Sequence, residues 1–195
     1  EKDCALIMEH VKGDTLQDLL PKISQIEEAN AHLGNAGRWL ASFQQPTMKP
    51  AAFDTKPHMN WLLKKLKRHE ENLMVIPDYD AFMVDFRHLE QLAAEVQGLP
   101  CARCVTHRDF HLGNLLIGRK GTVYGIDFEN KNEDDALRDV ISILFDFAIK
   151  RPANATEIEH LQTAAVAFWE GYGDHATAPL VFEFFQRSEE RRVGK

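Results

Sequence analysis

Three polar residues between positions 109 and 127 have side chains of the types that phosphoryl transfer from a nucleotide requires. Asp109 and Asn114 lie in the run T-H-R-D-F-H-L-G-N, and Asp127 lies in the later run G-I-D-F-E. A carboxylate can orient and deprotonate an attacking hydroxyl, and an amide with a second carboxylate can supply the hard oxygen ligands that magnesium prefers. The residue types and their spacing are therefore consistent with transfer of a phosphoryl group from ATP.

Short β-type runs flank these residues and are expected to position them. Segments 104–106, 115–117 and 122–126 have strand character, and glycine-bearing turns separate them. The turn with Gly118 and Gly121 joins the last two runs, which predicts a β-hairpin. The three polar residues are thus expected on loops or strand edges.

Helical periodicity accounts for most of the remaining chain. Thr15 with Asp18, and Ser24 with Glu27, resemble capping boxes at helix starts. The helix expected at 136–149 is apolar around most of its circumference, so we place it in the core, with Asp139 on its narrow polar face. The other expected elements are a strand at 5–11, helices at 15–20, 24–43, 58–73, 82–96, 154–169 and 180–186, a proline-rich loop at 45–57 and an aperiodic tail at 187–195.

The composition predicts one soluble globular domain. The chain has 195 residues, 44% apolar side chains and a formal net charge of −7, and a chain of this length can bury a sizeable core. An acidic chain lacks the basic face that nucleic acids and anionic membranes require, so we exclude these partners. Three cysteines are too few for a disulfide framework, and neither a signal-peptide core nor a membrane-spanning run is found, so we expect a cytoplasmic protein.

Two motifs resemble those of protein-kinase-like phosphotransferases. Residues 107–114 fit the pattern H-R-D-x-x-x-x-N, and Asp127 begins a D-F-E run where protein kinases carry D-F-G. Because His111 stands two residues after the acid, the first run is similar to the H-x-D-x-H-x-x-N motif of the aminoglycoside phosphotransferase and choline kinase families. Few residues separate Asp127 from the next helix and no A-P-E follows, which favours a small-molecule acceptor over a protein.

The resemblance implies a fold and a domain organisation. The expected fold class is α+β, a protein-kinase-like C-terminal lobe that is mainly helical, with a small antiparallel β-hairpin carrying the catalytic loop. Residues 1–13 would form a hinge-like strand and turn, 14–186 the helical lobe, and 187–195 a polar tail. The glycine-rich loop and strand lysine of such kinases belong to an N-terminal lobe. We expect that lobe to be missing from this chain, which would then be an inactive fragment by itself.

Carried over residue by residue, the resemblance implies ATP and Mg²⁺ as cofactors. Asp109 would be the catalytic base, and Asn114 and Asp127 would hold magnesium and the nucleotide phosphates. His107 and His111, also at catalytic positions, would order the loop.

The resemblance also implies roles outside the two motifs. The backbone of Glu9, His10 and Val11 would border the adenine, and Asp139 would be a buried acceptor that ties the loop to its helix. The acceptor substrate would be an aminoglycoside, a choline-like compound or a sugar.

Other interpretations stay open from the sequence. Arg108 departs from the glycine that aminoglycoside enzymes commonly carry and is closer to lipopolysaccharide-core sugar kinases. The lobe could also be a non-catalytic kinase-like module. A zinc-binding module is a further alternative, because Cys101, Cys104, His107 and His111 form the pattern C-x2-C-x2-H-x3-H, and cysteine and histidine are the side chains that bind zinc. The acids at 129 and 133–135 could attract a polycationic acceptor or simply favour the start of the next helix.

Overall fold

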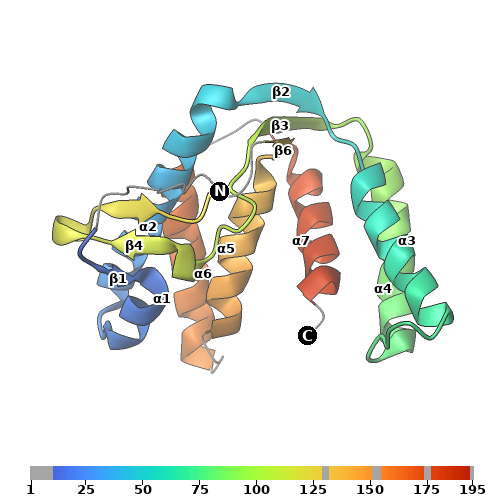
Figure 1. The fold of residues 1–195 in the computed structure, drawn as a ribbon, viewed down its shortest axis with the longest axis horizontal. Helices are drawn as coiled ribbons and strands as arrows, with labels where there is room; N and C mark the ends of the chain where they lie inside the picture. The colour runs from blue at the N-terminus through green and yellow to red at the C-terminus, as the bar shows by residue number, and fades with distance from the viewer. Residues whose placement is uncertain (1–10, 129–131, 151–154, 174–176, 194–195) are drawn as a thin grey trace, which may run out of the picture. The chain divides into compact units, whose positions relative to one another are not determined.

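The computed structural model describes residues 11–128, 132–150, 155–173 and 177–193 (Figure 1). The chain divides into two units. Unit 1 consists of Glu1–Phe43, Asp109–Phe128 and Asp146–Gly173, and unit 2 of Gln44–Arg108, Glu129–Phe145 and Asp174–Lys195. In the described residues each unit combines helices with a three-stranded antiparallel sheet. This confirms the expected α+β class, mainly helical with small antiparallel sheets.

Unit 1 contains the predicted hairpin. Strand β4, Leu115–Ile117, pairs antiparallel with β1, Asp14–Thr15, and with β5, Val123–Gly125. The 3-10 turn η4, Arg119–Gly121, joins β4 to β5, and both Lys120 and Gly121 have positive φ there. The remaining described elements of the unit are α1 (Leu16–Leu19), η1 (Leu20–Lys22), α2 (Ile26–Gln44, whose last residue falls in unit 2), η3 (Leu112–Asn114), the end of α5 from Asp146 on, and α6 (Ala155–Tyr172).

The predicted capping box at the start of α1 is present. Thr15 Oγ1 accepts a hydrogen bond from the Asp18 backbone N–H at 3.1 Å and donates to Asp18 Oδ2 at 2.7 Å. The helix ends at Leu19, and the chain continues as the 3-10 turn that contains Pro21, because proline cannot donate the next helical hydrogen bond. The sequence therefore predicts the start of this helix well and its end to within one residue.

Helices α2 and α6 pack backbone against backbone in unit 1. A β-carbon on Gly37 would collide with the carbonyl oxygen of Phe168, and one on Gly171 would collide with the carbonyl oxygen of Gly34. Neither obstacle is a flexible side chain, so the collision can be relieved only by moving a helix. The close approach of α2 and α6 therefore depends on these glycines.

Replacing Gly37 with alanine is expected to destabilise the fold by about 2 kcal/mol, because the added methyl group overpacks the contact between the helices. Chemical denaturation of the purified chain measures this change. Ser42→Ala, an exposed change on the same helix, is the control and is expected to have little effect. A Gly37→Ala variant as stable as this control would contradict the close-packing argument.

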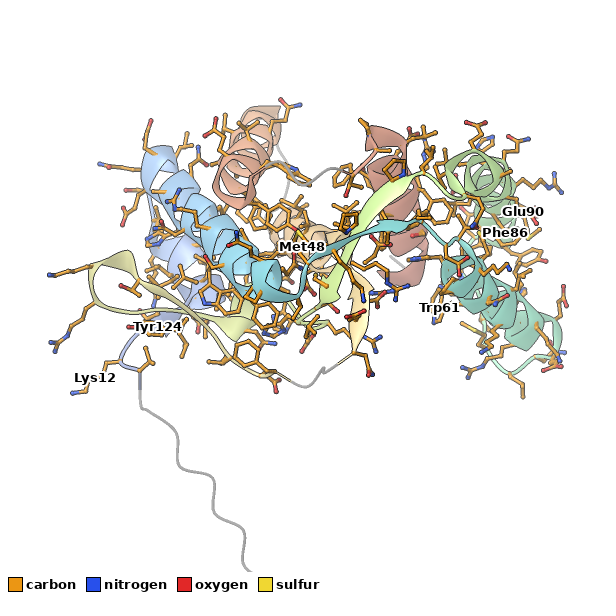
Figure 2. All side chains as sticks on the ribbon, turned by 90° about the horizontal axis from the view of Figure 1, so that it is seen from above. Lys12, Met48, Trp61, Phe86, Glu90 and Tyr124 are labelled. Carbon is orange, nitrogen blue, oxygen red and sulfur yellow. The ribbon has the colours of Figure 1, made fainter. Side chains whose placement is uncertain are left out.

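In the described residues, unit 2 contains the second sheet, three helices packed beside one another, and the part of α5 (Leu137–Lys150) up to Phe145. Strand β3, Pro100–Val105, lies between β2, Lys49–Ala52, and β6, Glu133–Asp135. Helix α7, Pro179–Val193, packs against α4, Tyr79–Val96, and α3, Lys56–Glu70. Met48, labelled in Figure 2, packs on a small buried cluster of Ala102, Cys104 and Ala136. None of the described helices is long and apolar enough to cross a membrane.

Strand β6, formed by the acids at 133–135, was not predicted, although α5 does follow it, from Leu137. Two expectations in unit 2 are wrong. Segment 45–57 is not a loop: β2 forms despite Pro50, since β2 is an edge strand, and Pro57 lies in the first turn of α3, where proline is tolerated. The tail is helical as far as Val193, and the Arg187–Glu183 ion pair and buried Ser188 belong to that helix.

Candidate functional site

Asp109 lies exposed on the segment between β3 and β4. The next residue, Phe110, is fully buried and stacks on Trp39 of α2 with 5.7 Å between ring centroids. The Asp109 side chain, by contrast, is 59% exposed. The buried ring therefore anchors the loop and leaves the adjacent carboxylate accessible to a substrate, which a general base requires.

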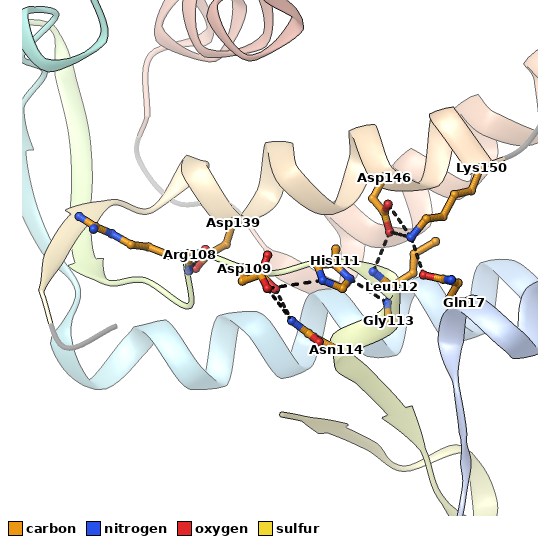
Figure 3. Close-up of polar contacts among 10 residues, drawn as sticks. All are labelled: Gln17, Arg108, Asp109, His111, Leu112, Gly113, Asn114, Asp139, Asp146 and Lys150. Atoms are coloured by element: carbon orange, nitrogen blue, oxygen red, sulfur yellow. Dashed lines mark hydrogen bonds and ion pairs between the residues drawn. The ribbon is translucent and has the colours of Figure 1, made fainter. Parts of the chain in front are cut away.

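Asn114 is hydrogen-bonded to Asp109. Its side chain is buried, and Nδ2 donates to the Asp109 carbonyl oxygen at 2.9 Å and to Asp109 Oδ2 at 3.1 Å (Figure 3). Because Nδ2 is turned toward Asp109, Oδ1 is the amide atom left to face a cation. The structure thus brings together two residues that the sequence predicts to act together.

His111 completes the loop around Asp109. Its Nδ1 accepts from the Gly113 backbone N–H at 3.0 Å, and its Nε2 lies 3.5 Å from Asp109 Oδ2 (Figure 3). With Nδ1 accepting, the ring carries its proton on Nε2, which faces the carboxylate. This geometry is consistent with the predicted loop-ordering role.

The β4–β5 hairpin brings Asp127 toward Asn114. Leu115 pairs with Gly125, and the next residue along, Ile126, donates its backbone N–H to the Asn114 carbonyl oxygen at 3.0 Å. Asp127 follows directly, exposed, with a φ of 65°. Residues other than glycine rarely adopt such a backbone conformation, and Asp and Asn tolerate it best.

Aromatic rings support this end of the hairpin. Phe128 packs on Trp39 and Phe43 of α2, with centroid distances of 5.9 and 5.5 Å. A β-carbon on Gly125 would collide with the Trp39 ring. The indole therefore contacts both Phe110, directly after Asp109, and Phe128, directly after Asp127, so one side chain supports both segments.

In unit 2, Asp139 holds the beginning of the loop. Its fully buried carboxylate accepts from the backbone N–H groups of His107 at 2.8 Å and Arg108 at 2.9 Å, and from Gln44 Nε2 at 3.0 Å. Burial raises the pKa of Asp139, and these hydrogen bonds act in the opposite direction. Arg108 has a φ of 68°, a backbone that glycine adopts without strain, so the Asp139 hydrogen bond stabilises a strained position.

Asp146 on α5, Leu137–Lys150, is a site residue that sequence reasoning missed. Its Oδ2 accepts from the Leu112 backbone N–H at 2.9 Å, and Lys150 Nζ pairs with it and donates to Gln17 Oε1 at 2.6 Å (Figure 3). A signal was present, since Asp139 and Asp146 are seven residues apart and share the polar face of an apolar helix. We infer that Asp146 positions the second half of the loop.

Replacing Asp146 with alanine is expected to speed amide hydrogen exchange at Leu112 about tenfold or more, because the N–H loses a charge-assisted hydrogen bond. Asp146→Asn keeps an acceptor and should preserve most of the protection. Lys150→Ala, which removes the ion pair and the hydrogen bond to Gln17 but leaves the Asp146 carboxylate, is the second control. Equal exchange rates at Leu112 in Asp146→Ala and in the two controls would contradict this positioning role.

Comparison with known proteins identifies the family. Residues 1–180 match the APH phosphotransferase enzyme family. The chain belongs to this family. No curated protein shows significant similarity to it.

The fold of this family member is similar to solved structures of a glucosamine kinase. Crystal forms B and A match with TM-scores of 0.64 and 0.61 at 15% and 17% sequence identity, covering 94% and 91% of this chain but 53% and 48% of those chains. A glucosamine kinase in complex with glucosamine, ADP and inorganic phosphate matches with a TM-score of 0.61 at 16% identity, over 91% of this chain and 49% of that one. The chain therefore spans about half the length of these structures, and at such identities the likeness is one of fold.

The adenine border predicted for this phosphotransferase-family chain falls largely outside the described residues. Glu9 and His10 lie outside the described residues, and Val11 is the first described residue, so the predicted adenine border stays a prediction. The His107 side chain is buried in unit 2. Its backbone N–H donates to Asp139 and so helps to order the loop.

The zinc alternative finds no support in the described part of the chain. No group of three or more His, Cys, Asp or Glu side chains there is arranged to hold a metal ion. Burial raises the pKa of Cys101 to about 11 and that of Cys104 to about 12, and zinc binds the thiolate. A magnesium site needs fewer protein ligands, because this ion retains several waters and binds phosphates.

Proposed function

We propose that this chain carries the acceptor-side catalytic residues of an ATP-dependent phosphotransferase that acts on a hydroxyl group of a small molecule. The observation that supports this best is the hydrogen bond that fixes Asn114 against the exposed carboxylate of Asp109. The short path from Asp127 to α5, which begins at Leu137, leaves little room for a protein-binding segment and supports a small acceptor.

Asp109 would accept the proton of the acceptor hydroxyl. The hydroxyl oxygen forms a bond to the γ-phosphorus of ATP, the bond between that phosphorus and the β,γ-bridging oxygen breaks, and ADP leaves with the bonding electrons. The products are the phosphate ester and ADP, and the proton passes from Asp109 to water. Asn114 and His111 would keep the carboxylate oriented toward the hydroxyl during this step.

The residues present fit a magnesium ion. Asn114 Oδ1 and the Asp127 carboxylate are hard oxygen donors, and the Ile126–Asn114 hydrogen bond keeps their segments adjacent. When bound, magnesium would neutralise phosphate charge. The positive φ of Asp127 and the aromatic packing of Phe128 would hold the carboxylate in place before the ion binds.

The proposed function is tested by measuring ADP formation with magnesium, ATP and a panel of hydroxyl compounds that includes sugars, choline and aminoglycosides. The assay uses this chain and the longest natural polypeptide that contains it. Acceptor-dependent ADP formation, with a phosphate ester detected by mass spectrometry, is the expected result. The absence of any ester from the longer polypeptide across the panel would contradict the proposal.

Magnesium is expected to increase the affinity for ADP. Replacing Asp127 with asparagine is expected to reduce this increase about tenfold, since a charged metal ligand is lost. Asparagine tolerates positive φ, so the backbone should be retained. Titration calorimetry with and without magnesium measures the effect. Asp80→Asn removes an exposed acid from the first turn of α4 and is the control. An unchanged magnesium effect in Asp127→Asn would contradict the ligand assignment.

A further inference from the structure

Gln44, the last residue of α2, is fully buried in unit 2. Its Nε2 group donates one hydrogen bond to Asp139 Oδ2 at 3.0 Å and one to the Ala136 carbonyl oxygen at 3.1 Å. Glutamine side chains are mostly exposed in proteins, and both N–H groups of this amide are used inside the unit. A buried amide with two such partners has a defined orientation, which raises the question of what it orients.

Through Asp139, the Gln44 amide acts on the residues that directly precede Asp109. Asp139 Oδ2 also accepts from the His107 backbone N–H at 2.8 Å, and Oδ1 accepts from the Arg108 backbone N–H at 2.9 Å (Figure 3). Gln44 therefore restricts the rotation of the carboxylate that meets both backbone groups. A rotated carboxylate would leave one of the two N–H groups without its acceptor, at a point where Arg108 already has a φ of 68°.

The turn after Gln44 holds the other end of the same segment. In the 3-10 turn η2, Gln45–Thr47, Thr47 Oγ1 accepts from the Val105 backbone N–H at 2.9 Å. The same hydroxyl donates to the Gln44 carbonyl oxygen at 3.2 Å. Thr47 and Gln44 thus hold segment 105–108 at its beginning and at its end.

Gln44 also stabilises the charged form of Asp139. Burial raises the pKa of Asp139, while the two backbone hydrogen bonds and the one from Gln44 lower it. Two further titratable groups interact with Asp139. The charge of the His107 side chain would also lower its pKa, and Cys104 on β3 stays neutral because its own pKa is about 12. A protonated carboxyl would place a donor among backbone N–H groups that need acceptors, so the segment depends on the ionised form.

We propose that Gln44 is a positioning residue for the phosphotransfer reaction. Its amide keeps the Asp139 carboxylate ionised and in one orientation, and that carboxylate fixes the backbone that leads into the general base, Asp109. Thr47 supports the same segment from its other end. This inference rests on the proposed phosphotransferase function, because it assigns Gln44 an effect on the reaction without a contact to substrate.

Hydrogen exchange and NMR on the chain itself test the contact. Gln44→Met keeps the length of the side chain but removes the amide. The His107 and Arg108 backbone N–H groups are expected to exchange about tenfold or more faster, since their shared acceptor loses a hydrogen bond to its charge. Carbon-13 NMR of the Asp139 carboxyl should show titration at a higher pH than in the unchanged chain. Gln45→Met, the adjacent and exposed glutamine, is the control and should change neither.

The effect on catalysis is measured in the longest natural polypeptide that contains this chain. Gln44→Met is expected to lower kcat for ester formation about tenfold or more and to leave the KM for ATP nearly unchanged, because a small misplacement of the general base slows the chemical step. The loss should be greatest at acidic pH, where Asp139 becomes protonated more readily without Gln44. Gln45→Met should match the unchanged protein at every pH.

Thr47 provides a second test that does not depend on the folding of Gln44→Met. Thr47→Val keeps the shape of the side chain and removes the hydroxyl, so exchange at Val105 should become faster and kcat should fall. Thr47→Ser keeps the hydroxyl and should restore both values.

The outcomes separate this proposal from the proposed function. A Gln44→Met protein that folds normally by thermal unfolding, with unchanged kcat and unchanged exchange at His107 and Arg108, would overturn the positioning role. If Gln44→Met does not fold, unchanged kcat and unchanged Val105 exchange in Thr47→Val would overturn it instead. The absence of ester formation by the unchanged polypeptide would contradict the phosphotransferase function itself, and the exchange rates would still decide whether Gln44 orders the segment.

Discussion

Replacing Asp109 with asparagine is expected to lower kcat for ester formation about a thousandfold and to leave the KM for ATP nearly unchanged. General-base catalysis contributes about 10² to 10⁴ in rate. Asparagine can still accept the hydrogen bond that Asn114 donates to the Asp109 carboxylate, so the loop should keep its geometry. The decrease in kcat therefore reports the loss of proton transfer to Asp109 and not a change in the folding of the loop. Steady-state assay of the longest natural polypeptide, with the ester quantified by mass spectrometry, provides the measurement.

The control for this prediction is Asp80→Asn, which removes another exposed aspartate. Its activity should match that of the unchanged protein. His111→Asn offers a second comparison, because it removes the ring beside Asp109 but leaves the carboxylate. We expect that variant to lose less activity than Asp109→Asn. An Asp109→Asn enzyme that retains a tenth or more of the activity would mean that another group removes the proton.

Replacing Asp135 with asparagine is expected to stabilise the protein at pH 8 by up to about 4 kcal/mol. Burial, with the neighbouring Asp134 charge adding to it, raises the pKa of Asp135 from 3.8 to about 7. The folded state therefore binds this proton more tightly than the unfolded state. One pH unit of difference corresponds to about 1.4 kcal/mol, so the difference of about three units gives the expected size.

The sign of the Asp135 effect follows from proton linkage. The pKa of Asp135 is higher in the folded state than in the unfolded state. The stabilisation that its protonation gives to the folded state is therefore complete below about pH 4 and is lost as the pH rises through about 7. The advantage of Asp135→Asn should therefore grow between pH 4.5 and 8 and stay small at the acidic end. Denaturation of both proteins across this range measures the difference, with Asp80→Asn as the control. A difference that is constant with pH would contradict the raised pKa.

The local elements near the site could be predicted from sequence because short-range signals determine them. The Gly118 and Gly121 turn, the flanking β-type runs and the Thr15 capping box all act within a few residues, and each is present. Asp139 stood out as an acid on the narrow polar face of an apolar helix, the family resemblance implied that it ties the loop to that helix, and it does accept hydrogen bonds from the loop backbone.

The errors concern elements whose stability comes from distant residues. Strand β2 contains a proline and β6 consists of acids, so neither has local strand preference. Both form because they pair with β3, and the Lys49–Glu133 ion pair links one edge strand to the other. No pattern among neighbouring residues in the sequence indicates that β2 and β6 pair with β3.

The helical tail and Asp146 were missed for a related reason. Burial of Ser188 among the unit 2 helices is a tertiary effect that periodicity over 187–195 does not show. The spacing of Asp139 and Asp146 predicts a shared helix face, but which backbone N–H meets Asp146 depends on how the loop folds back. The hydrogen bond from Gln44 to Asp139 likewise joins residues that lie far apart in the sequence.

The proposed function requires Asp109, Asn114 and Asp127 to form one site for a metal–nucleotide complex. Paramagnetic line broadening by Mn²⁺ with ADP tests this directly, because manganese accepts the same oxygen ligands as magnesium and broadens nearby amide signals. We expect selective broadening of the Asp109, Asn114 and Asp127 amide signals and not of the Asp80 signal, and we expect this broadening to be lost in Asp127→Asn. Broadening centred elsewhere in the chain, or unchanged in Asp127→Asn, would contradict the proposed function.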